Sequence, residues 1–406
     1  MILRALLALV LAPAGFAQDF SQTSTDWPQW RGPVRDGVST ESDWSSAGAE
    51  KSLWEREVGR GYSSVSIVGE RLYTSGFDEE GSADVVWCLD ATTGEEVWAH
   101  AYPARVWNEM HGGGTLATPS VDGEHVYVLD REGRLLRLAA DDGEVEWDRE
   151  LAKELDVKPP RWGFSASPLV LSDVVVVNLG LVVALDKEKG DVRWKSAKSY
   201  GDAYSTPADF VYDDSPSLAV FAGEGLVILR QQNGEELLFH PWKTQYDINA
   251  ATPVIADDRV FISSGLGRGG ALLKLAGTKP EVVWETKGMS NKMSGCVLWA
   301  KHLYGFDESE LKCFDLDGKE KWRARGVGDG ALICAGGRLI CTSSRGELVV
   351  AEATPNEYRE LSRAKVMDEG VFWTTPVISK GRIYLRSSSG KLVCRDHRKQ
   401  SQEPPR

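Results

Sequence analysis

Eight copies of one short pattern recur along the chain at a mean spacing of about 43 residues, and this repeat constrains the fold more than any other feature. Each copy begins with a Ser/Thr-Pro step, passes through a polar turn that contains glycine into an apolar strand, and ends in Gly-x-x-x-Trp. Well-preserved examples are residues 252–262 and 89–98. Repeats of roughly 40 to 50 residues built only from strand patterns are typical of β-propeller blades. We therefore predict an all-β fold, an eight-bladed propeller.

The blades are counted by the aromatic or apolar residue that closes each copy. Residues 375–396 form an eighth copy that has no closing strand of its own. Residues 52–58, which contain Trp54, precede the first full copy. We expect this N-terminal strand to close the last blade, which would remove free sheet edges. The other seven closing positions are Trp98, Trp147, Trp194, Leu238 with Phe239, Trp284, Trp322 and Tyr358.

The recurring residues of the repeat are assigned structural roles. An aspartate four residues before the turn glycine can accept hydrogen bonds from backbone N–H groups, while the glycine adopts a positive φ. The tryptophan that follows is expected to fill the wedge between two blades, with its indole N–H on a nearby carbonyl. This structural set comprises Trp54, Asp90, Gly94, Trp98, Gly143, Trp147, Asp186, Gly190, Trp194, Trp284, Gly318 and Trp322.

The N-terminus has the pattern of a secretory signal. Arg4 precedes an apolar stretch over residues 5–12, and Gly15 and Ala17 place small residues before a cleavage point. No cysteine follows the apolar stretch until Cys88, so a lipobox is absent, and we expect a periplasmic or secreted protein. The expected organisation is a signal peptide over 1–17, an extended leader over 18–51, the propeller over 52–397 and a polar tail over 398–406.

The charge balance argues against several partners. The chain carries 60 acidic and 47 basic residues, a formal net charge of −13. Such a balance disfavours nonspecific binding to nucleic acid or anionic lipid. No apolar run after the N-terminus approaches the ~20 residues of a membrane span. We expect no nucleic-acid partner, no integral membrane span and a monomer.

Six cysteines are present in a chain with an export signal. Cys88, Cys313 and Cys394 occupy equivalent inner-strand places in three blades, which indicates small buried residues rather than disulfide partners. Cys334 and Cys341 flank the Gly336-Gly337 turn, but a two-residue loop there would pair residue 334 with 339 and residue 332 with 341. A disulfide between them is not favoured. Cys296 has no evident partner.

The run from Leu89 to Gly94 with Trp98, Leu-Asp-Ala-Thr-Thr-Gly-x-x-x-Trp, resembles the repeat of pyrroloquinoline quinone (PQQ) propellers. That repeat is shared by quinoprotein alcohol dehydrogenases and by BamB-like proteins, non-enzymatic propellers of the outer-membrane β-barrel assembly machine. The opening Trp27-Pro28-Gln29-Trp30-Arg31-Gly32-Pro33 resembles the leader of exported bacterial PQQ-like propellers. The resemblance extends from Trp27 to about Asp396 and implies the fold. Because the repeat is structural, the resemblance says little about activity.

Quinoprotein dehydrogenases of this family place PQQ between a disulfide of adjacent cysteines and a tryptophan. A calcium ion is bound by carboxylate and amide oxygens, and an aspartate acts as base. No two cysteines of this chain are adjacent, and neither a calcium ligand nor the base is located by motif, so catalytic residues stay unassigned. The histidines lack zinc-site spacing, and residues 315–318 lack the remaining ligands of a calcium loop. We expect no metal and no cofactor, with PQQ and Ca²⁺ only if the chain is a dehydrogenase.

Residues that enter the innermost strands meet near the axis of a propeller, where loops form binding sites. On one interpretation, which we favour, their aromatic side chains cap the channel and pack the loops. On the other, they form a funnel that stacks a planar or sugar-like ligand. Trp27 and Trp30 of the leader likewise either bury against the propeller, which we favour, or contact a partner. The ligand-binding candidates at the mouth are Tyr62, Trp107, Asn108, Glu109, His111, Trp162, Tyr204, Asn249, Lys292, Asp329 and Trp373.

Three functions from different classes follow. The leading one is an exported, non-catalytic scaffold or protein-binding module of the cell envelope, BamB-like in architecture, whose partner is an envelope or secreted protein or peptide. The second is a PQQ-dependent dehydrogenase of alcohols or sugars. The third is a carbohydrate-binding propeller in which the aromatic residues of the funnel hold a glycan.

Overall fold

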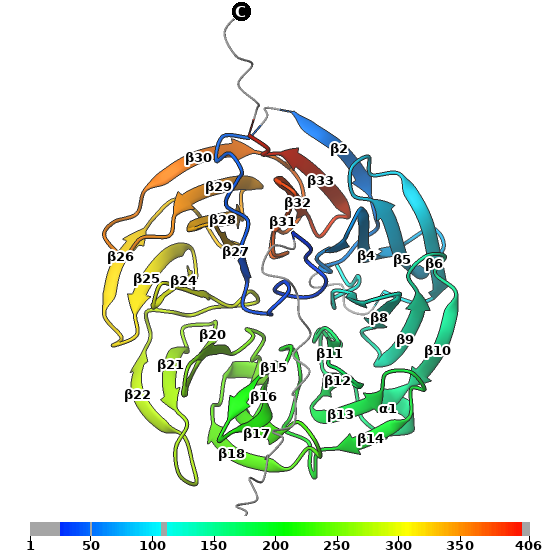
Figure 1. Cartoon of the computed structure of the whole chain (residues 1–406), viewed down its shortest axis with the longest axis vertical. Helices are drawn as coiled ribbons and strands as arrows, with labels where there is room; N and C mark the ends of the chain where they lie inside the picture. The colour runs from blue at the N-terminus through cyan, green and yellow to red at the C-terminus, as the bar shows by residue number, and fades with distance from the viewer. Residues whose placement is uncertain (1–24, 49–50, 107–111, 400–406) are drawn as a thin grey trace, which may run out of the picture.

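Eight small β-sheets surround one axis and form a closed ring (Figure 1). The computed structural model describes residues 25–48, 51–106 and 112–399. Within each sheet, neighbouring strands of the propeller run antiparallel, from the innermost strand at the axis to the outermost at the rim. The predicted all-β, eight-bladed propeller is thereby confirmed. The predicted signal peptide over 1–17 lies outside the described residues.

The first four blades follow one another along the chain, each from its innermost to its outermost strand. Blade 1 comprises β3 (Ser66–Val68), β4 (Arg71–Asp78), β5 (Ala83–Asp90) and β6 (Glu96–Pro103); blade 2 comprises β7 (Ser120–Asp122), β8 (His125–Leu129), β9 (Arg134–Ala139) and β10 (Val145–Glu150), followed by helix α1 (Leu151–Glu154); blade 3 comprises β11 (Leu169–Val170), β12 (Val174–Leu179), β13 (Leu181–Asp186) and β14 (Val192–Lys195); blade 4 comprises β15 (Ala208–Tyr212), β16 (Ser215–Ala222), β17 (Gly225–Arg230) and β18 (Glu236–Pro241), followed by a 3₁₀ turn (Gln245–Asp247).

The last four blades repeat this order, with the final outer strand taken from the N-terminus. Blade 5 comprises β19 (Val254–Ala256), β20 (Arg259–Ser264), β21 (Gly269–Lys274) and β22 (Glu281–Thr286); blade 6 comprises β23 (Val297–Trp299), β24 (His302–Asp307), β25 (Glu310–Asp315) and β26 (Glu320–Ala324); blade 7 comprises β27 (Gly330–Ala335), β28 (Arg338–Ser343), β29 (Glu347–Glu352) and β30 (Glu360–Lys365), with β1 (Val38–Ser39) parallel to β27; blade 8 comprises β31 (Val377–Ser379), β32 (Arg382–Arg386), β33 (Lys391–Asp396) and β2 (Ser52–Glu57).

The strand near the N-terminus completes blade 8, as predicted. β2 runs antiparallel to β33, and Trp54 lies opposite Cys394 in the ladder. Figure 1 shows this blue strand on the outside of the red strands at the end of the chain. The ring is therefore closed by backbone hydrogen bonds between two segments at opposite ends of the propeller sequence.

Tryptophans on five of the outermost strands join a blade to the next one. Trp98 of blade 1 donates its indole N–H to the Ala140 carbonyl of blade 2 at 3.0 Å. Gly143 in the same turn packs against the indole ring of Trp98. A Cβ at position 143 would lie 2.6 Å from a carbon of that indole, so the turn requires glycine. The predicted role of the repeat tryptophan is thus observed. The same indole-to-carbonyl hydrogen bond recurs at Trp54, Trp147, Trp284 and Trp322.

Blade 7 departs from the predicted pattern. Strand β30 begins after Tyr358, and Ser362 lies opposite Val350 at the register that tryptophan holds elsewhere. Tyr358 therefore does not close the blade; its ring packs 5.6 Å from that of Trp322. The prediction failed here because this copy lacks the Gly-x-x-x-Trp spacing that fixes the register in other blades.

The leader supplies the tryptophan that blade 7 lacks. Trp44 is fully buried beside blades 7 and 8. The Arg338 guanidinium lies 3.7 Å from the centre of its ring, and His397 of the last blade meets it edge to face at 6.2 Å. Trp44, which is not part of any repeat, thereby fills the space between blades 7 and 8.

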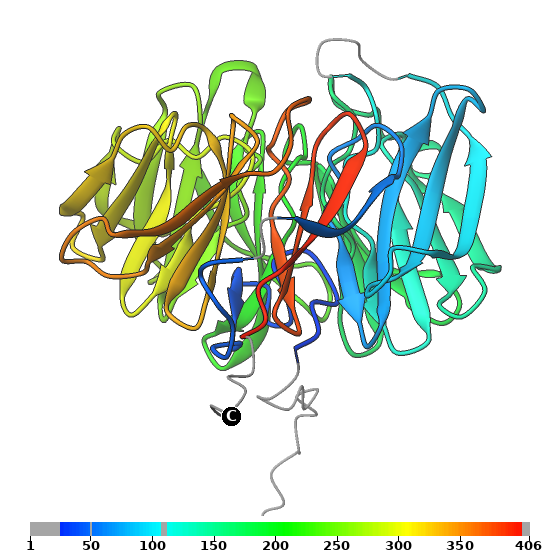
Figure 2. The ribbon, with the colours of Figure 1, turned by 90° about the horizontal axis from the view of Figure 1, so that it is seen from above.

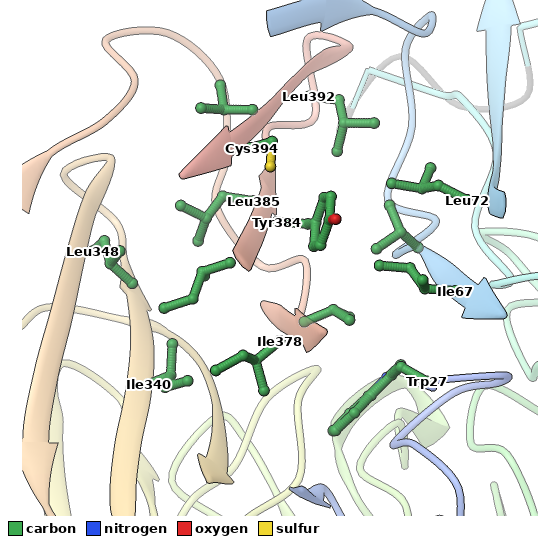
Figure 3. Close-up of a cluster of buried hydrophobic side chains, with 14 of the residues drawn as sticks. Trp27, Ile67, Leu72, Ile340, Leu348, Ile378, Tyr384, Leu385, Leu392 and Cys394 are labelled. Atoms are coloured by element: carbon green, nitrogen blue, oxygen red, sulfur yellow. The ribbon is translucent and has the colours of Figure 1, made fainter. Parts of the chain in front are cut away.

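A hydrophobic core occupies the seam where the ring closes (Figure 3). Figure 3 shows Ile378 and Tyr384 of blade 8 among side chains of blades 7 and 1, with Trp27 of the leader below Ile67. Tyr384 also donates its hydroxyl to the Ala91 carbonyl of blade 1 at 2.9 Å. The leader and the closure seam are thus parts of one core.

Residues 27–41, which we call the plug segment, contact all eight blades near the axis (Figures 1 and 2). The contacts are Trp27 with Ile67, the Pro28 carbonyl with the Val121 N–H, Arg35 with the Val170 carbonyl and with Asp209, Trp30 with Thr252, Arg31 with the Cys296 carbonyl, the Gly37 carbonyl with the Cys334 N–H, and Glu41 with the N–H groups of Lys380 and Gly381.

The plug segment is turn-rich rather than extended throughout. Arg31 and Arg35 adopt positive φ values of 64° and 61°, and their side chains satisfy backbone carbonyls. The expected extended leader is therefore wrong over this part, because these two arginines hold turns that no periodic pattern encodes. Trp27 is buried, with 2% of its surface exposed, which agrees with the favoured interpretation.

All six cysteines are buried and free. Leu332 faces Cys341 and Cys334 faces Leu339, which confirms the predicted pairing across the Gly-Gly turn. Cys88, Cys313 and Cys394 do share one place, but that place is the third strand of each blade, not an inner strand. In the described part of the chain, no helix has both the length and the apolar character needed to cross a membrane.

Candidate functional site

A cavity of about 170 Å³ lies where loops enter the innermost strands around the axis. Five aromatic side chains dominate its lining, and we call it the aromatic cavity. Aliphatic and methionine side chains also line it. The aromatic residues are Trp30, Tyr62, Trp162, Tyr204 and Trp373, and the others are Gly113, Gly114, Leu116, Ser165, Ser167, Thr206, Ile248, Ala250 and Met293.

The aromatic walls come from loops of different blades. Tyr62 precedes β3 and Trp373 precedes β31, and their rings stack at 5.7 Å with an interplanar angle of 25°. Trp162 and Tyr204 precede β11 and β15, and their rings meet at 6.0 Å and 58°. Stacked and tilted arrangements are the favourable geometries for aromatic rings. Sequence analysis predicted these four residues at the mouth, and the structure brings all four together.

The hydroxyl groups near the aromatic cavity serve the fold. Thr118 Oγ1 accepts the Ser64 N–H at 2.9 Å, Ser167 Oγ accepts the Thr118 N–H at 3.0 Å, and Thr206 Oγ1 accepts the Ser167 N–H at 2.8 Å. Each hydroxyl thus binds the backbone of the preceding blade. The Ser or Thr of the Ser/Thr-Pro step therefore has a structural role, because its hydroxyl links one blade to the preceding blade.

The plug segment closes one side of the aromatic cavity. Trp30 lines the cavity, and its indole N–H is donated to Thr252 Oγ1 at 3.0 Å. Sequence reasoning placed Trp30 in the leader but did not assign it to the mouth. The Trp-Pro-Gln-Trp run was the available signal, yet nothing in it indicates that the leader crosses the axis.

Arg161 lies between a ring of the cavity and an exposed ring, in a pair of cation–π contacts. The Arg161 guanidinium lies 5.1 Å from the Trp162 ring and 6.0 Å from that of Tyr246. Tyr246 is 57% exposed and has a φ of 63°. A non-glycine residue in this region of φ carries backbone strain, which concentrates at functional sites.

Burial shifts the pKa values of the tyrosine and aspartate side chains at and beside the cavity. Burial raises the pKa of the Tyr204 phenol, whose hydroxyl donates to Asp202 at 3.4 Å, so the phenol stays neutral. Burial and the nearby carboxylate of Asp247 raise the pKa of Asp202. Burial also raises the pKa of the Tyr62 phenol. The tyrosine side chains that line the cavity are therefore neutral.

Three predicted mouth residues lie outside the cavity lining. Asn249 is buried, donates to the Ala222 carbonyl at 2.7 Å and accepts from Ser264 at 2.6 Å, so its amide is structural. Lys292 and Asp329 form an ion pair at 3.1 Å, and Lys292 directly precedes Met293 of the cavity lining. The candidates Trp107, Asn108, Glu109 and His111 lie outside the described residues.

The described lining does not fit a calcium-bound quinone. PQQ carries carboxylate groups that require cationic or calcium partners, and calcium requires oxygen ligands such as carboxylates. No Asp, Glu, Lys or Arg side chain is among the described residues that line the cavity. Across the described ranges, no three His, Cys, Asp or Glu side chains are grouped as metal ligands would be.

Comparison with known proteins gives a consistent result. Residues 82–323 match a family model described as outer membrane protein assembly factor BamB. Curated relatives with that description include one from Burkholderia pseudomallei (strain K96243), 29% identical over 202 residues that cover 48% of this chain and 45% of the relative. Another, from Yersinia pestis, is 27% identical over 155 residues, 35% of each chain. The matches therefore span less than half the length of these relatives.

Solved structures share the fold. BamB from Moraxella catarrhalis superposes with a TM-score of 0.62 at 17% identity, covering 87% of this chain and 99% of that one. The quinohemoprotein alcohol dehydrogenase from Comamonas testosteroni gives a TM-score of 0.68 at 13% identity, covering 96% and 83%. At these identities the likeness establishes the propeller alone, because binding proteins and enzymes share it.

Proposed function

Because the chain belongs to the family of the outer membrane protein assembly factor BamB, we propose that it is an exported, non-catalytic propeller that binds a protein partner in the cell envelope. The family model covers more than half of the chain. Its curated relatives are described as outer membrane protein assembly factors, which supports a partner among envelope or secreted proteins and a periplasmic location. The signal-like N-terminus supports export.

The observation that carries this proposal is the chemistry of the aromatic cavity. Its described lining is aromatic, aliphatic and uncharged, and the hydroxyls of Ser167 and Thr206 bind backbone N–H groups. Such a lining offers contact area without an acid, a base or a nucleophile. Tyrosine, tryptophan and methionine are among the residues enriched at protein interfaces. The described lining therefore supports a role in binding.

Retention of envelope proteins by the purified mature protein tests the proposal. Immobilised wild type is expected to retain a defined partner from a detergent extract of envelopes, and Trp373→Ala is expected to lose it. Val211→Ala serves as the control, because Val211 is 68% exposed on β15 and does not line the cavity. Equal retention by all three proteins, or none by wild type, would count against the proposal.

A quinoprotein dehydrogenase is the second candidate, because such enzymes share both the repeat and the propeller fold. Titration with PQQ, with and without Ca²⁺, distinguishes it, followed by the cofactor's absorbance and by tryptophan fluorescence. The proposed function predicts no saturable binding at high micromolar PQQ. Saturable, calcium-dependent binding would place the dehydrogenase first and call for a screen of alcohols and sugars.

A carbohydrate-binding role rests on the same aromatic rings. Sugars stack on such rings but also need polar partners for their hydroxyl groups, and the described hydroxyls of Ser167 and Thr206 already bind the backbone. Binding on a glycan array that is lost in Trp107→Ala or Trp373→Ala would support this role.

A further inference from the structure

Resting on the proposed function, we infer that the aromatic cavity is a socket for one aromatic side chain of the partner polypeptide. The inference follows from three features of the described residues: the size of the cavity, the chemistry of its walls, and its closure on one side.

The size of the cavity matches a single ring. Its volume of about 170 Å³ is close to that of an apolar protein cavity of about 150 Å³ that takes up benzene. One phenyl or indole group therefore fills the space, whereas a folded element is excluded. A short aliphatic side chain fills it incompletely and forfeits dispersion contacts with the walls.

The walls favour a ring over an aliphatic group of similar size. Tyr62 and Trp373 present one stacked pair, and Trp162 and Tyr204 present another pair at an angle. A ring inside the cavity can contact side chains of both pairs, because all four line it. Aromatic pairs in such geometries are favourable beyond the area that they bury.

The plug segment determines how a ligand enters. Trp30 lines the cavity and is fixed to Thr252, and residues 27–41 contact every blade around the axis. A polypeptide therefore cannot thread through the ring in this structure. A side chain inserted from the loop side, with its backbone remaining outside, satisfies this constraint.

Acidic and basic side chains both lie at the edge of the cavity. Asp202 accepts from Tyr204, a wall residue, and Asp247 lies close enough to affect its ionisation. Lys243 pairs with Asp247 at 3.5 Å and Arg161 stacks on Trp162, so the edge also holds positive charge. These charges offset one another, so the selectivity of the cavity comes from its rings.

Titration with short capped peptides tests the inference. Acetyl-Gly-Trp-Gly-amide, its Phe and Leu counterparts, and a Trp peptide with Glu in place of one Gly are titrated against the mature protein by saturation-transfer NMR. We expect the Trp and Phe peptides to bind roughly threefold to tenfold more tightly than the Leu peptide. We expect the Glu-containing peptide to bind no more tightly than the Gly-Trp-Gly peptide.

Two variants assign the binding to the cavity. Trp373→Ala removes a wall and Ala250→Leu fills the space while keeping every ring, so both are expected to weaken binding of the Trp peptide at least about threefold. Val211→Ala is expected to leave it unchanged. Thermal melting of each variant verifies that it is folded.

The inference is overturned if the Leu peptide binds as tightly as the Trp peptide, if a folded Ala250→Leu protein binds the Trp peptide as wild type does, or if no peptide binds at millimolar concentration. Its failure is distinguishable from failure of the proposed function. Retention of an envelope protein that depends on Trp373, without aromatic selectivity among peptides, would remove only the socket. Aromatic-selective peptide binding without any retained envelope protein would remove the proposed function.

Discussion

At the scale of single residues, the ring-closure seam depends on a side chain that lies outside the repeat. Trp44 takes the place that Trp98 and its equivalents hold in other seams, and it is fully buried between an arginine and a histidine. The seam lacks its own tryptophan because Ser362 occupies that register. Decay of the repeat in blade 7 is thus compensated by the leader.

Trp44→Ala is expected to lower the free energy of unfolding by about 3 kcal/mol, because it leaves a large cavity beside blade 8. Urea denaturation followed by circular dichroism measures the change. Ser42→Ala, at an exposed position whose carbonyl rather than side chain binds Arg338, is the control and is expected to behave as wild type. A Trp44→Ala protein as stable as that control would show that the leader does not support the seam.

The six buried thiols are expected to be unreactive in the folded protein. Burial raises the pKa of Cys88 to about 11 and that of Cys296 to about 12, so neither forms thiolate near neutral pH. Ellman's reagent at pH 8 is expected to titrate no thiol before unfolding and all six in guanidinium. Rapid reaction of the native protein, or fewer than six thiols after unfolding without reductant, would contradict this.

Asp130 makes stability depend on pH. It accepts the N–H groups of Glu132 and Arg134, while burial raises its pKa to about 6, with the Asp84 and Glu132 carboxylates adding to the rise. The folded state therefore binds a proton more readily than the unfolded state, and this site's contribution to stability increases as pH falls from about 6 toward 4.

Asp130→Asn keeps an oxygen acceptor without the charge. We expect the variant to be more stable than wild type at pH 7.5, with an advantage that shrinks at pH 5, as measured by urea midpoints at both values. Comparing the variant with wild type at both pH values cancels the titration of groups that do not interact with Asp130. A stability difference that does not change between the two pH values would contradict this assignment.

At the scale of elements, the outermost strand of blade 8 decides whether the ring is closed. β2 pairs with β33, and Trp54 bonds to the Ala91 carbonyl of blade 1. Removing it would expose both the edge of β33 and the side of blade 1. Exposed strand edges pair with other chains.

A protein that begins at Gly59 is expected to melt at a lower temperature and to form oligomers through the free edge of β33. Light scattering coupled to size-exclusion chromatography measures the oligomers, and calorimetry measures the melting temperature. A monomer with unchanged melting would refute closure by β2.

The plug segment is a second element with a separable effect. A protein that begins at Ser52 keeps β2 but lacks Trp44 and residues 27–41, which carry the contacts to all eight blades. We expect it to remain monomeric, because the ring is still closed, and to melt below wild type. Oligomers as extensive as those of the protein that begins at Gly59 would show that the leader, rather than β2, closes the ring.

At the scale of the whole molecule, the repeat was sufficient to predict the propeller ring and its closure. It did not predict the plug segment that crosses the axis. The Asp, Gly and Trp positions recur because each blade needs the same turn and wedge, so periodicity reveals them. The plug segment has no repeat, and its turns depend on Arg31 and Arg35 reaching carbonyls that are distant in sequence. Its contribution of Trp30 to the aromatic cavity therefore could not be predicted.

The candidate site could be predicted only where its residues hold a fixed position in the repeat. Tyr62, Trp162, Tyr204 and Trp373 were found because they precede innermost strands, and position in the repeat fixes their place at the mouth. Asn249 also precedes an innermost strand, yet its amide turns inward to the backbone. Side-chain direction within irregular loops is not encoded by the spacing of the repeat.

Site-specific photo-crosslinking most directly tests the claim that this mouth binds protein. A photoreactive phenylalanine analogue replaces Tyr62 at the cavity or Val211 on the exposed face of β15, and intact envelopes are irradiated. The account predicts one defined protein adduct from position 62, abolished by Trp373→Ala, and none from position 211. Absence of any protein adduct from position 62, or the same adducts from both positions, would contradict it.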